Sequence, residues 1–272
     1  MYTPPSIETV KRATAAARSY FRPQYFGLEN VDPSQPALYV CNHTIYGFLD
    51  GPLLFQKLYE EKGIVLRALG DNAHFKVPLW GKMLKRGGSV PGSPENCTQL
   101  MENREHILVY PGGGREVAKR KGEQYKLTWK TRTGFARMAI EHQYPIIPVA
   151  ALGADDAYDV VWDAYDLMES KVGQLLLKNK RINSVLRGGD LVMPLAKGVG
   201  PTLIPKPEKF YFLLGDPIHT DRFQGQHKNK EVQWQLRKEV MERIESQLDV
   251  LRGVRDQDSD SGAIRKLLTK RK

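Results

Sequence analysis

The sequence predicts an α/β protein whose central sheet is largely parallel and flanked by helices. Short apolar runs recur along the chain, and segments with apolar residues at helical spacing alternate with them. A parallel sheet needs this order, because each strand is joined to the next by a long crossover that is usually a helix. No Gly/Ser-rich linker and no internal repeat divides the chain. We therefore expect one α/β domain.

The individual elements follow from apolar runs and turn residues. Strands are expected at 37–40, 64–69, 107–110, 145–150 and 210–218, the last with its exit turn. Helices are expected at 6–21, 51–61, 94–101, 134–142 and 231–251. Asp155, Asp159 and Asp163 recur at i, i+4 and i+8, which predicts a solvated helix face. No histidine or cysteine joins these acids, so they do not predict a metal site.

The expected domain organisation has three parts. Residues 1–35 hold a basic amphipathic helix, residues 36–251 form the main domain, and residues 252–272 are a charged tail that we expect to be flexible. The apolar side chains of the first helix are small. Packing of this helix on the domain is favoured, and contact with a membrane surface is the alternative.

Charge and cysteine content limit the class of protein. The net charge of +10 and pI near 9.5 indicate an anionic partner: nucleic acid, a membrane surface or a phosphorylated molecule. No nucleic-acid-binding motif is present, so nucleic acid is not expected. Cys41 and Cys97 are the only cysteines, which argues against a disulfide framework and against structural zinc.

The longest apolar stretches are shorter than the roughly 18 residues that a transmembrane helix needs. Basic residues interrupt the N-terminal region, which therefore does not resemble a signal peptide. We expect a cytoplasmic protein without a transmembrane helix, peripherally associated with the inner face of a membrane.

Two segments carry the chemistry, and each follows a predicted strand. The first runs from Cys41 to Asp50 and contains His43; the second runs from Tyr110 to Glu116 and reads Tyr-Pro-Gly-Gly-Gly-Arg-Glu. Histidine accepts a proton near neutral pH, and a carboxylate such as Asp50 can orient it.

The second segment offers donors for negative charge. Backbone N–H groups of Gly112, Gly113 and Gly114 can bind an oxyanion, and Arg115 can bind a phosphate. A tight turn with positive φ angles also explains a glycine run without any ligand. Together the two segments predict transfer of an activated acyl group to an alcohol.

This arrangement resembles the PlsC-like superfamily of lysophospholipid and glycerolipid acyltransferases. In that family Asn-His-x4-Asp carries the base, Phe-Pro-Glu-Gly-Thr-Arg binds the acceptor, and a later Ile-Val-Pro-Val strand completes the site. Asn42–His43, 110–115 and 146–149 match in order, and the resemblance covers about residues 36 to 150. It implies an α/β fold, an acyl-CoA or acyl carrier protein donor as co-substrate, a lipid hydroxyl acceptor and no further cofactor.

Two departures distinguish the chain from the family pattern. Phe48 stands at the usual acid position, and Asp50 lies two residues beyond it. Gly112 replaces the acid of the second motif, while Glu116 follows the arginine. Both features resemble a divergent branch that includes diacylglycerol acyltransferase-like proteins and the acyltransferase part of phytyl ester synthases. The resemblance implies a neutral lipid or a long-chain alcohol as acceptor.

Two basic groups add candidate anion sites. One lies between Arg115 and Arg137, and the other contains Lys76, Lys82, Lys85 and Arg86. They fit phosphates of CoA, an acidic carrier protein or anionic lipid headgroups, and a solvated surface explains them equally well. The apolar residues within the second group are expected to lie in the core, with an acyl tunnel or a membrane wedge as alternatives: Phe75, Leu79, Trp80 and Met83.

The sequence therefore predicts an O-acyltransferase with a histidine base. A thioesterase or lipid esterase, and a non-enzymatic basic membrane-binding protein, are the alternatives. The expected catalytic residues are His43 and Asp50. The expected substrate-binding residues are Gly112, Gly113, Gly114, Arg115, Glu116 and Arg86.

Overall fold

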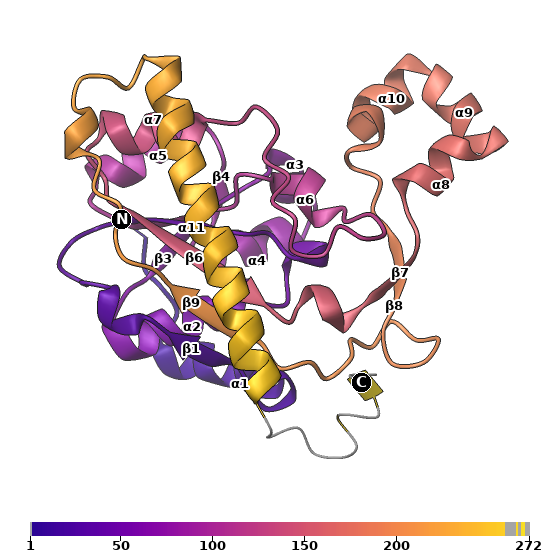
Figure 1. Cartoon of the computed structure of the whole chain (residues 1–272), viewed down its shortest axis with the longest axis horizontal. Helices are drawn as coiled ribbons and strands as arrows, with labels where there is room; N and C mark the ends of the chain where they lie inside the picture. Colours follow the sequence, from indigo (N-terminus) through magenta and orange to yellow (C-terminus); the bar gives the residue numbers. More distant parts are fainter. Residues whose placement is uncertain (1, 259–264, 266–267, 270–272) are drawn as a thin grey trace.

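The computed structural model describes residues 2–258, 265, 268 and 269. Its centre is a seven-stranded sheet (Figure 1). The strands, in spatial order, are β1 (Gln24–Phe26), β9 (Tyr211–Leu214), β6 (Ile146–Leu152), β2 (Leu38–Cys41), β5 (His106–Val109), β3 (Leu66–Gly70) and β4 (Val90–Pro91). Every neighbouring pair is parallel except β6 with β9. The predicted α/β fold with a largely parallel sheet is confirmed.

Helices cover both faces of the sheet (Figure 1). One face, which includes Leu38 and Val40 of β2, packs on α5 (Pro94–Glu102), α7 (Gly134–Glu141) and α11 (Lys230–Gln257). The other, which includes Tyr39 and Cys41, packs on α1 (Ile7–Phe21) and α2 (Gly51–Lys62). Because alternate residues of a strand point to opposite faces, β2 is buried on both sides and reads as a continuous apolar run.

Capping residues fix the ends of the predicted helices. The side chains of Ser6, Asp50 and Ser93 accept hydrogen bonds from backbone N–H groups in the first turns of α1, α2 and α5. Gly63 ends α2 in the left-handed conformation, with φ of 67°. These boundaries agree with the sequence predictions.

The N-terminal segment is integrated into the domain. Val10, Thr14 and Phe21 of α1 are buried, and the rings of Phe21 and Phe210 stack with centroids 4.1 Å apart. β1 then joins the edge of the sheet beside β9. The favoured packing of this helix on the domain is confirmed. None of the helices in the described residues is long and apolar enough to cross a bilayer.

The predicted helix face at Asp155, Asp159 and Asp163 is wrong. Asp155 lies in the 3₁₀ helix η3 (Asp155–Ala157), Asp159 begins β7 (Asp159–Trp162), and Asp163 caps α8 (Ala164–Glu169). Aspartate side chains bond readily to nearby backbone N–H groups, which competes with continuous helix.

β7 pairs with β8 (Leu195–Lys197) in a two-stranded ribbon. Three short helices lie between these strands in the sequence and stand off from the main sheet in Figure 1: α8 (Ala164–Glu169), α9 (Lys171–Lys178) and α10 (Lys180–Leu186).

The basic segment after β3 forms α3 (Asn72–Lys76) and α4 (Trp80–Arg86). Leu79 and Met83 are 78% and 57% exposed, so the prediction that they belong to the core is wrong. Phe75 and Trp80 are half-buried. Gly81 of α4 packs against the backbone of Phe75 in α3, and the ring of Phe75 packs against Gly70 of β3. Helices this short bury only the sides that make such contacts, so Leu79 and Met83 remain exposed.

Remaining helices are short: α6 (Gly113–Val117) and the 3₁₀ helices η1 (Leu28–Asn30), η2 (Ile45–Gly47), η4 (Arg187–Gly189) and η5 (Asp221–Phe223). The predicted C-terminal helix is confirmed and continues to Gln257, so residues 252–257 are helical and not a flexible tail. The rest of that predicted tail lies mostly outside the described residues.

Candidate active site

The two predicted segments meet at one edge of the sheet. β2 and β5 are parallel neighbours, with Val40 opposite Val109, so the loops that follow them leave the sheet at the same edge. The ring of His43 stacks on the ring of Tyr110, with centroids 4.1 Å apart and an interplanar angle of 18°. The structure therefore brings the histidine and the glycine-rich segment together.

His43 is neutral at physiological pH. Burial lowers the pKa of His43 to about 3, and the nearby Lys119 and His74 add to this effect. Its Nδ1 atom is buried and has no hydrogen-bond partner among the described residues, although the residue as a whole is only partly buried. A neutral, partly accessible imidazole can accept a proton from a hydroxyl group.

The backbone of the loop closes tightly around this ring. Gly47 has φ of 67°, and a Cβ atom there would lie 2.4 Å from Cε1 of His43. A side chain at this position would displace the imidazole. Gly47 is therefore needed both for its left-handed backbone and for the close approach.

Three buried side chains hold the loop in place. The amide of Asn42 bonds to both the carbonyl and the N–H of Ala151 in β6, at 3.0 and 2.8 Å. Oε1 of Glu116 accepts the N–H of His43 at 2.9 Å, and Oδ1 of Asp155 accepts the N–H of Ile45 at 2.6 Å. Carboxylates from two other parts of the chain thus bind alternate N–H groups of the histidine loop.

Gly112 and Glu116 are interdependent. A Cβ atom on Gly112 would lie only 1.6 Å from Oε2 of Glu116, so the carboxylate occupies the space that a side chain at position 112 would take. Oε2 is buried and has no hydrogen-bond partner among the residues that the structure describes. Burial raises the pKa of Glu116 to about 7, and the ammonium group of Lys119 opposes that rise. An acid is missing from position 112, but a carboxylate stands beside it.

Lys119 and Asp155 complete the charge balance beneath the loop. Both are buried, and Nζ of Lys119 lies 3.4 Å from Oδ2 of Asp155. That oxygen also accepts the N–H of Tyr125 at 2.8 Å. Sequence reasoning missed both residues. For Asp155 a signal existed, because it comes soon after the all-apolar strand β6, at the same edge of the sheet as His43.

Asp50 does not pair with His43 in the structure. Its side chain is 2% exposed, and Oδ1 accepts the N–H of Gly51 at 2.9 Å as the cap of α2. Oδ2 of Asp50 and Nδ1 of His43 are both buried, and neither has a hydrogen-bond partner of good geometry among the described residues, although the side chain of Thr44 interacts with the Asp50 carboxylate. Burial raises the pKa of Asp50 to about 6. Asp50 acts as a helix cap here, and its predicted role as the orienting acid is not realised in this state.

The glycine run is only partly a turn. Gly113 has φ of 49° and donates its N–H to the carbonyl of Tyr110 at 2.9 Å. Gly112 and Gly114 have no positive φ, and within the described residues their N–H groups make no hydrogen bond. These two groups remain available as donors at the start of α6.

Arg115, the arginine of this segment, does not have the position that the sequence predicted. Arg115 is 6% exposed; its guanidinium makes two hydrogen bonds to Glu123, at 2.6 and 3.0 Å, and lies 3.6 Å from Asp190. Because two acids already neutralise it, Arg115 is not an open phosphate clamp. Arg132, which sequence reasoning did not single out, bonds instead to the carbonyls of Pro111 and Gly112.

Arg86 is exposed on α4, and among the described residues no hydrogen bond or ion pair joins its guanidinium to His43 or to the glycine-rich segment. Its backbone carbonyl accepts the hydroxyl of Tyr2 at 2.7 Å. The structure therefore does not bring Arg86 into the group of predicted site residues.

A cavity of about 340 Å³ lies beside the glycine-rich segment. Its wall is mostly apolar, with two arginines and a serine among its polar side chains. The lining residues are Leu38, Leu69, Gly92, Ser93, Pro94, Cys97, Val109, Tyr110, Pro111, Arg132, Gly134, Phe135, Arg137 and Met138. Tyr110 lines this cavity and also stacks on His43, so the cavity is adjacent to the candidate base.

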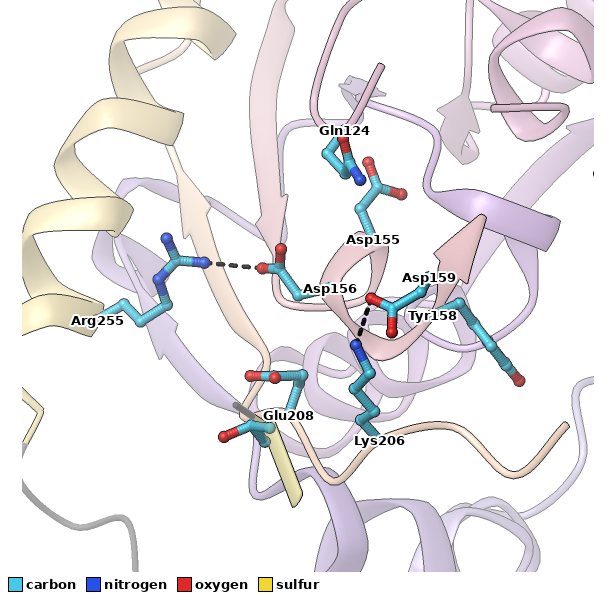
Figure 2. Close-up of a pocket in the computed structure, with 9 residues that line it drawn as sticks. Gln124, Asp155, Asp156, Tyr158, Asp159, Lys206, Glu208 and Arg255 are labelled. Carbon is cyan, nitrogen blue, oxygen red and sulfur yellow. Dashed lines mark hydrogen bonds and ion pairs between the residues drawn. The ribbon is translucent and has the colours of Figure 1, made fainter. Parts of the chain in front are cut away.

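A second cavity, of about 360 Å³, is polar and contains neither His43 nor the glycine-rich segment. Figure 2 shows two ion pairs among its lining residues: Arg255 with Asp156 at 2.8 Å, and Lys206 with Asp159 at 2.6 Å. These ion pairs join α11, η3 and the β7–β8 region. Asp155 also lines this cavity, so we interpret the two ion pairs as structural support for the segment that contains Asp155.

The chain matches the family model described as Acyltransferase over residues 22–152. It is 33% identical over 242 residues to "Phytyl ester synthase 2, chloroplastic" of Arabidopsis thaliana, with 85% of this chain and 34% of that protein covered. It is 31% identical over 123 residues to "DGAT1/2-independent enzyme synthesizing storage lipids" of Bos taurus, with 45% and 36% covered. The chain thus spans about a third of the length of these curated relatives.

A solved structure, that of the 1-acyl-sn-glycerophosphate (LPA) acyltransferase PlsC from Thermotoga maritima, has a similar fold. The TM-score is 0.51 at 12% sequence identity, and the match covers 88% of this chain and 78% of that chain. At this identity the likeness concerns the fold alone.

Proposed function

The chain belongs to the acyltransferase family through residues 22–152, as its motifs predicted, and from that premise we propose that it is an O-acyltransferase acting on lipid alcohols. The reaction moves a fatty acyl group from a thioester to a hydroxyl group. The observation that carries the proposal is the neutral imidazole of His43 beside the apolar cavity and the free N–H groups of the glycine-rich segment.

In the proposed reaction, the accessible nitrogen of His43 accepts the proton of the alcohol while the alcohol oxygen bonds to the thioester carbon. The resulting tetrahedral oxyanion accepts hydrogen bonds from the N–H groups of Gly112 and Gly114. The carbon–sulfur bond then breaks, and the imidazolium returns its proton to the leaving thiolate. The products are an ester and a free thiol, and no redox or metal chemistry is involved in these steps.

The apolar cavity of about 340 Å³ suits an acyl chain. Arg132 and Arg137 are part of its wall and supply positive charge next to the apolar surface. Arg137 is already paired with Glu141 at 3.0 Å. We therefore assign recognition of the anionic part of the donor, acyl-CoA or acyl carrier protein, to Arg132.

We propose a long-chain alcohol as acceptor, because two relatives, 33% and 32% identical, are named phytyl ester synthases. A neutral glycerolipid is the related choice that the storage-lipid enzyme favours. The missing acid at position 112 does not by itself support a neutral acceptor, since the Glu116 carboxylate fills the adjacent space.

Asp50 has a conditional place in this mechanism. Its Oδ2 and the Nδ1 of His43 are both buried without a hydrogen-bond partner of good geometry among the described residues, and catalytic hydrogen bonds often tighten only when substrate binds. We propose that the two pair in the substrate complex. Asp50→Asn tests this, because asparagine is an equally good helix cap. A lower rate with an unchanged melting temperature supports pairing, and an unchanged rate contradicts it.

The function is tested by incubating the purified protein with palmitoyl-CoA, with and without phytol or diacylglycerol, and identifying products by mass spectrometry. We expect an ester whose formation depends on the alcohol, with one free CoA released per ester. Release of free fatty acid at a rate indifferent to alcohol would identify a hydrolase and contradict the proposal. Absence of ester with CoA and with carrier-protein donors alike would also contradict it.

A further inference from the structure

The helices α8 to α10 expose an apolar surface that no part of the described chain covers. Val172, Leu175 and Val185 are 67%, 71% and 72% exposed, and Leu176 is 37% exposed. Neither α9 nor α10 contributes a residue to the apolar clusters of the domain. Large apolar side chains gathered on short projecting helices mark an interaction surface.

Two of these helices, α9 and α10, are basic. From Ser170 to Gly189 the chain contains five basic residues, Lys171, Lys178, Lys180, Arg181 and Arg187, and no acidic residue. Apolar side chains interspersed with lysine and arginine suit a bilayer with anionic headgroups: the apolar groups enter the interface while the cations remain at headgroup level.

A second pair of helices repeats this character. From Asn72 to Gly88 there are four lysine or arginine residues and no acid. Val77, Leu79 and Met83 are at least half exposed. Leu79 has φ of 62° and ψ of −53°, an unfavourable conformation for a residue with a side chain. Backbone strain of this kind is concentrated at functional sites, so we interpret the exposed position of Leu79 as functional.

An ion pair connects the two surfaces near the candidate active site. Nη2 of Arg187, just after α10, lies 3.2 Å from Oδ2 of Asp71, which caps α3. His74 of α3 is close enough to His43 to lower the pKa of His43. The two apolar, basic surfaces therefore flank the same edge of the sheet from which the histidine loop leaves.

We propose that α9–α10 and α3–α4 together form the face through which the protein binds an anionic lipid bilayer. This face is named the docking face below. The inference rests on the proposed function insofar as a lipid acceptor resides in a bilayer, so docking at this edge presents His43 to it. The binding itself follows from the exposed apolar residues and the charge, whatever the reaction.

The test is flotation of the purified protein with phosphatidylcholine vesicles, with or without phosphatidylglycerol. Wild type should float with the anionic vesicles and much less with phosphatidylcholine alone. The double variant Val172→Asp/Leu175→Asp should lose at least about tenfold in binding, because each aspartate removes an inserted apolar group and adds charge of the wrong sign. Leu79→Asp should weaken binding in the same direction.

The matched control is Leu203→Asp/Ile204→Asp, which changes two residues that are 76% and 58% exposed in the loop after β8, outside the docking face. This control should float like wild type. Equal flotation of the Val172→Asp/Leu175→Asp variant and wild type, or equal loss in the control, would overturn the proposal. Binding of an acidic carrier protein that depends on Val172 and Leu175, without vesicle binding, would also overturn it.

Activity is measured separately on phytol dispersed in detergent, where no bilayer is present. The Val172→Asp/Leu175→Asp variant should retain the wild-type rate there, which also verifies that it is folded. Vesicle binding without ester formation by any protein would contradict the proposed function and leave docking supported. Ester formation without vesicle binding would support the proposed function and contradict docking.

Discussion

The loop after β2 and the loop after β5 leave the sheet at the same edge, but their side chains are used in opposite ways. In the first loop the ionisable ring of His43 is partly exposed, and its backbone N–H groups are bound by carboxylates. In the second loop the charged side chains of Arg115 and Glu116 are buried, and backbone N–H groups are left free. The second loop supports the first, and we propose that its backbone N–H groups bind the ligand.

This difference changes how the side chains of the Gly-Gly-Gly-Arg-Glu segment are interpreted. Arginine and glutamate beside a glycine run look like ligands for the substrate, yet Arg115 is neutralised by Glu123 and Asp190. Glu116 bonds to the backbone of His43 and fills the space beside Gly112. Charged residues of a motif can therefore be positioning residues, while an unremarked residue, here Arg132, faces the cavity.

The largest effect should come from the reactive group of the first loop. His43→Ala removes the base and should lower kcat by about 10²–10⁴-fold, the usual contribution of general base catalysis. Steady-state rates with acyl-CoA and alcohol measure this, and His219→Ala, at an exposed histidine, is the control. A His43→Ala rate within a few-fold of wild type would show that the first loop does not carry the base.

The second largest effect on the rate should follow from adding a side chain at Gly112, where the two loops are in contact. Gly112→Ala places a methyl group where Oε2 of Glu116 lies, so the carboxylate must move and release the His43 backbone. We expect a loss of about 1–3 kcal/mol in stability from overpacking and roughly 10²-fold in rate from misplacement of the base.

Gly253→Ala is the control, since nothing lies within 4 Å of its Cβ position. Thermal unfolding and kinetics measure both quantities. Wild-type behaviour of Gly112→Ala would contradict the coupling of the loops.

The two arginines should respond differently. Arg115→Gln leaves the partly buried carboxylates of Glu123 and Asp190 uncompensated and should destabilise the fold by about 3 kcal/mol. Arg132→Ala should change stability by only about 1 kcal/mol but raise KM for acyl-CoA roughly tenfold, because a charge-assisted hydrogen bond contributes about 1.5–3 kcal/mol. Melting temperatures and KM values separate the two, and the reverse pattern would show that Arg115 is the ligand-facing arginine.

The smallest effect concerns pH. Burial raises the pKa of Glu116 from 4.5 to about 7, so the protonated form is favoured in the folded state. The stability that this group contributes is present below its unfolded pKa and is lost as pH rises through 7. The stability advantage of wild type over Glu116→Gln, measured as the free energy of unfolding, should therefore shrink between about pH 4.5 and pH 7 by at least about 1 kcal/mol. Parallel curves would contradict the burial of an ionisable Glu116.

Much of the fold followed from sequence because its signals are local. The strand at 37–40, the Ser6 and Ser93 caps and the helix ending at Gly63 depend on neighbouring residues, and the structure confirms them. The projecting helices α8 to α10 were missed, since their apolar residues pack on no core that would give a clear periodic stripe.

Less of the candidate site could be predicted from the sequence. His43 and the glycine run were placed correctly at one edge of the sheet, because strand ends can be read from apolar runs. Whether Arg115 faces a ligand or Glu123 depends on side-chain direction in three dimensions. The bond from Glu116 to the His43 backbone joins residues 73 positions apart, and no spacing rule predicts it.

The central claim is that Glu116 acts through His43 and does not bind substrate itself. The most direct test is a double-mutant cycle with His43→Ala and Glu116→Gln, measured by single-turnover acyl transfer. If Glu116 only positions the base, Glu116→Gln lowers the rate of the wild-type protein but costs nothing further once His43 is absent. If the two losses multiply instead, Glu116 contacts the substrate independently, and the account of the second loop as a support for the first is wrong.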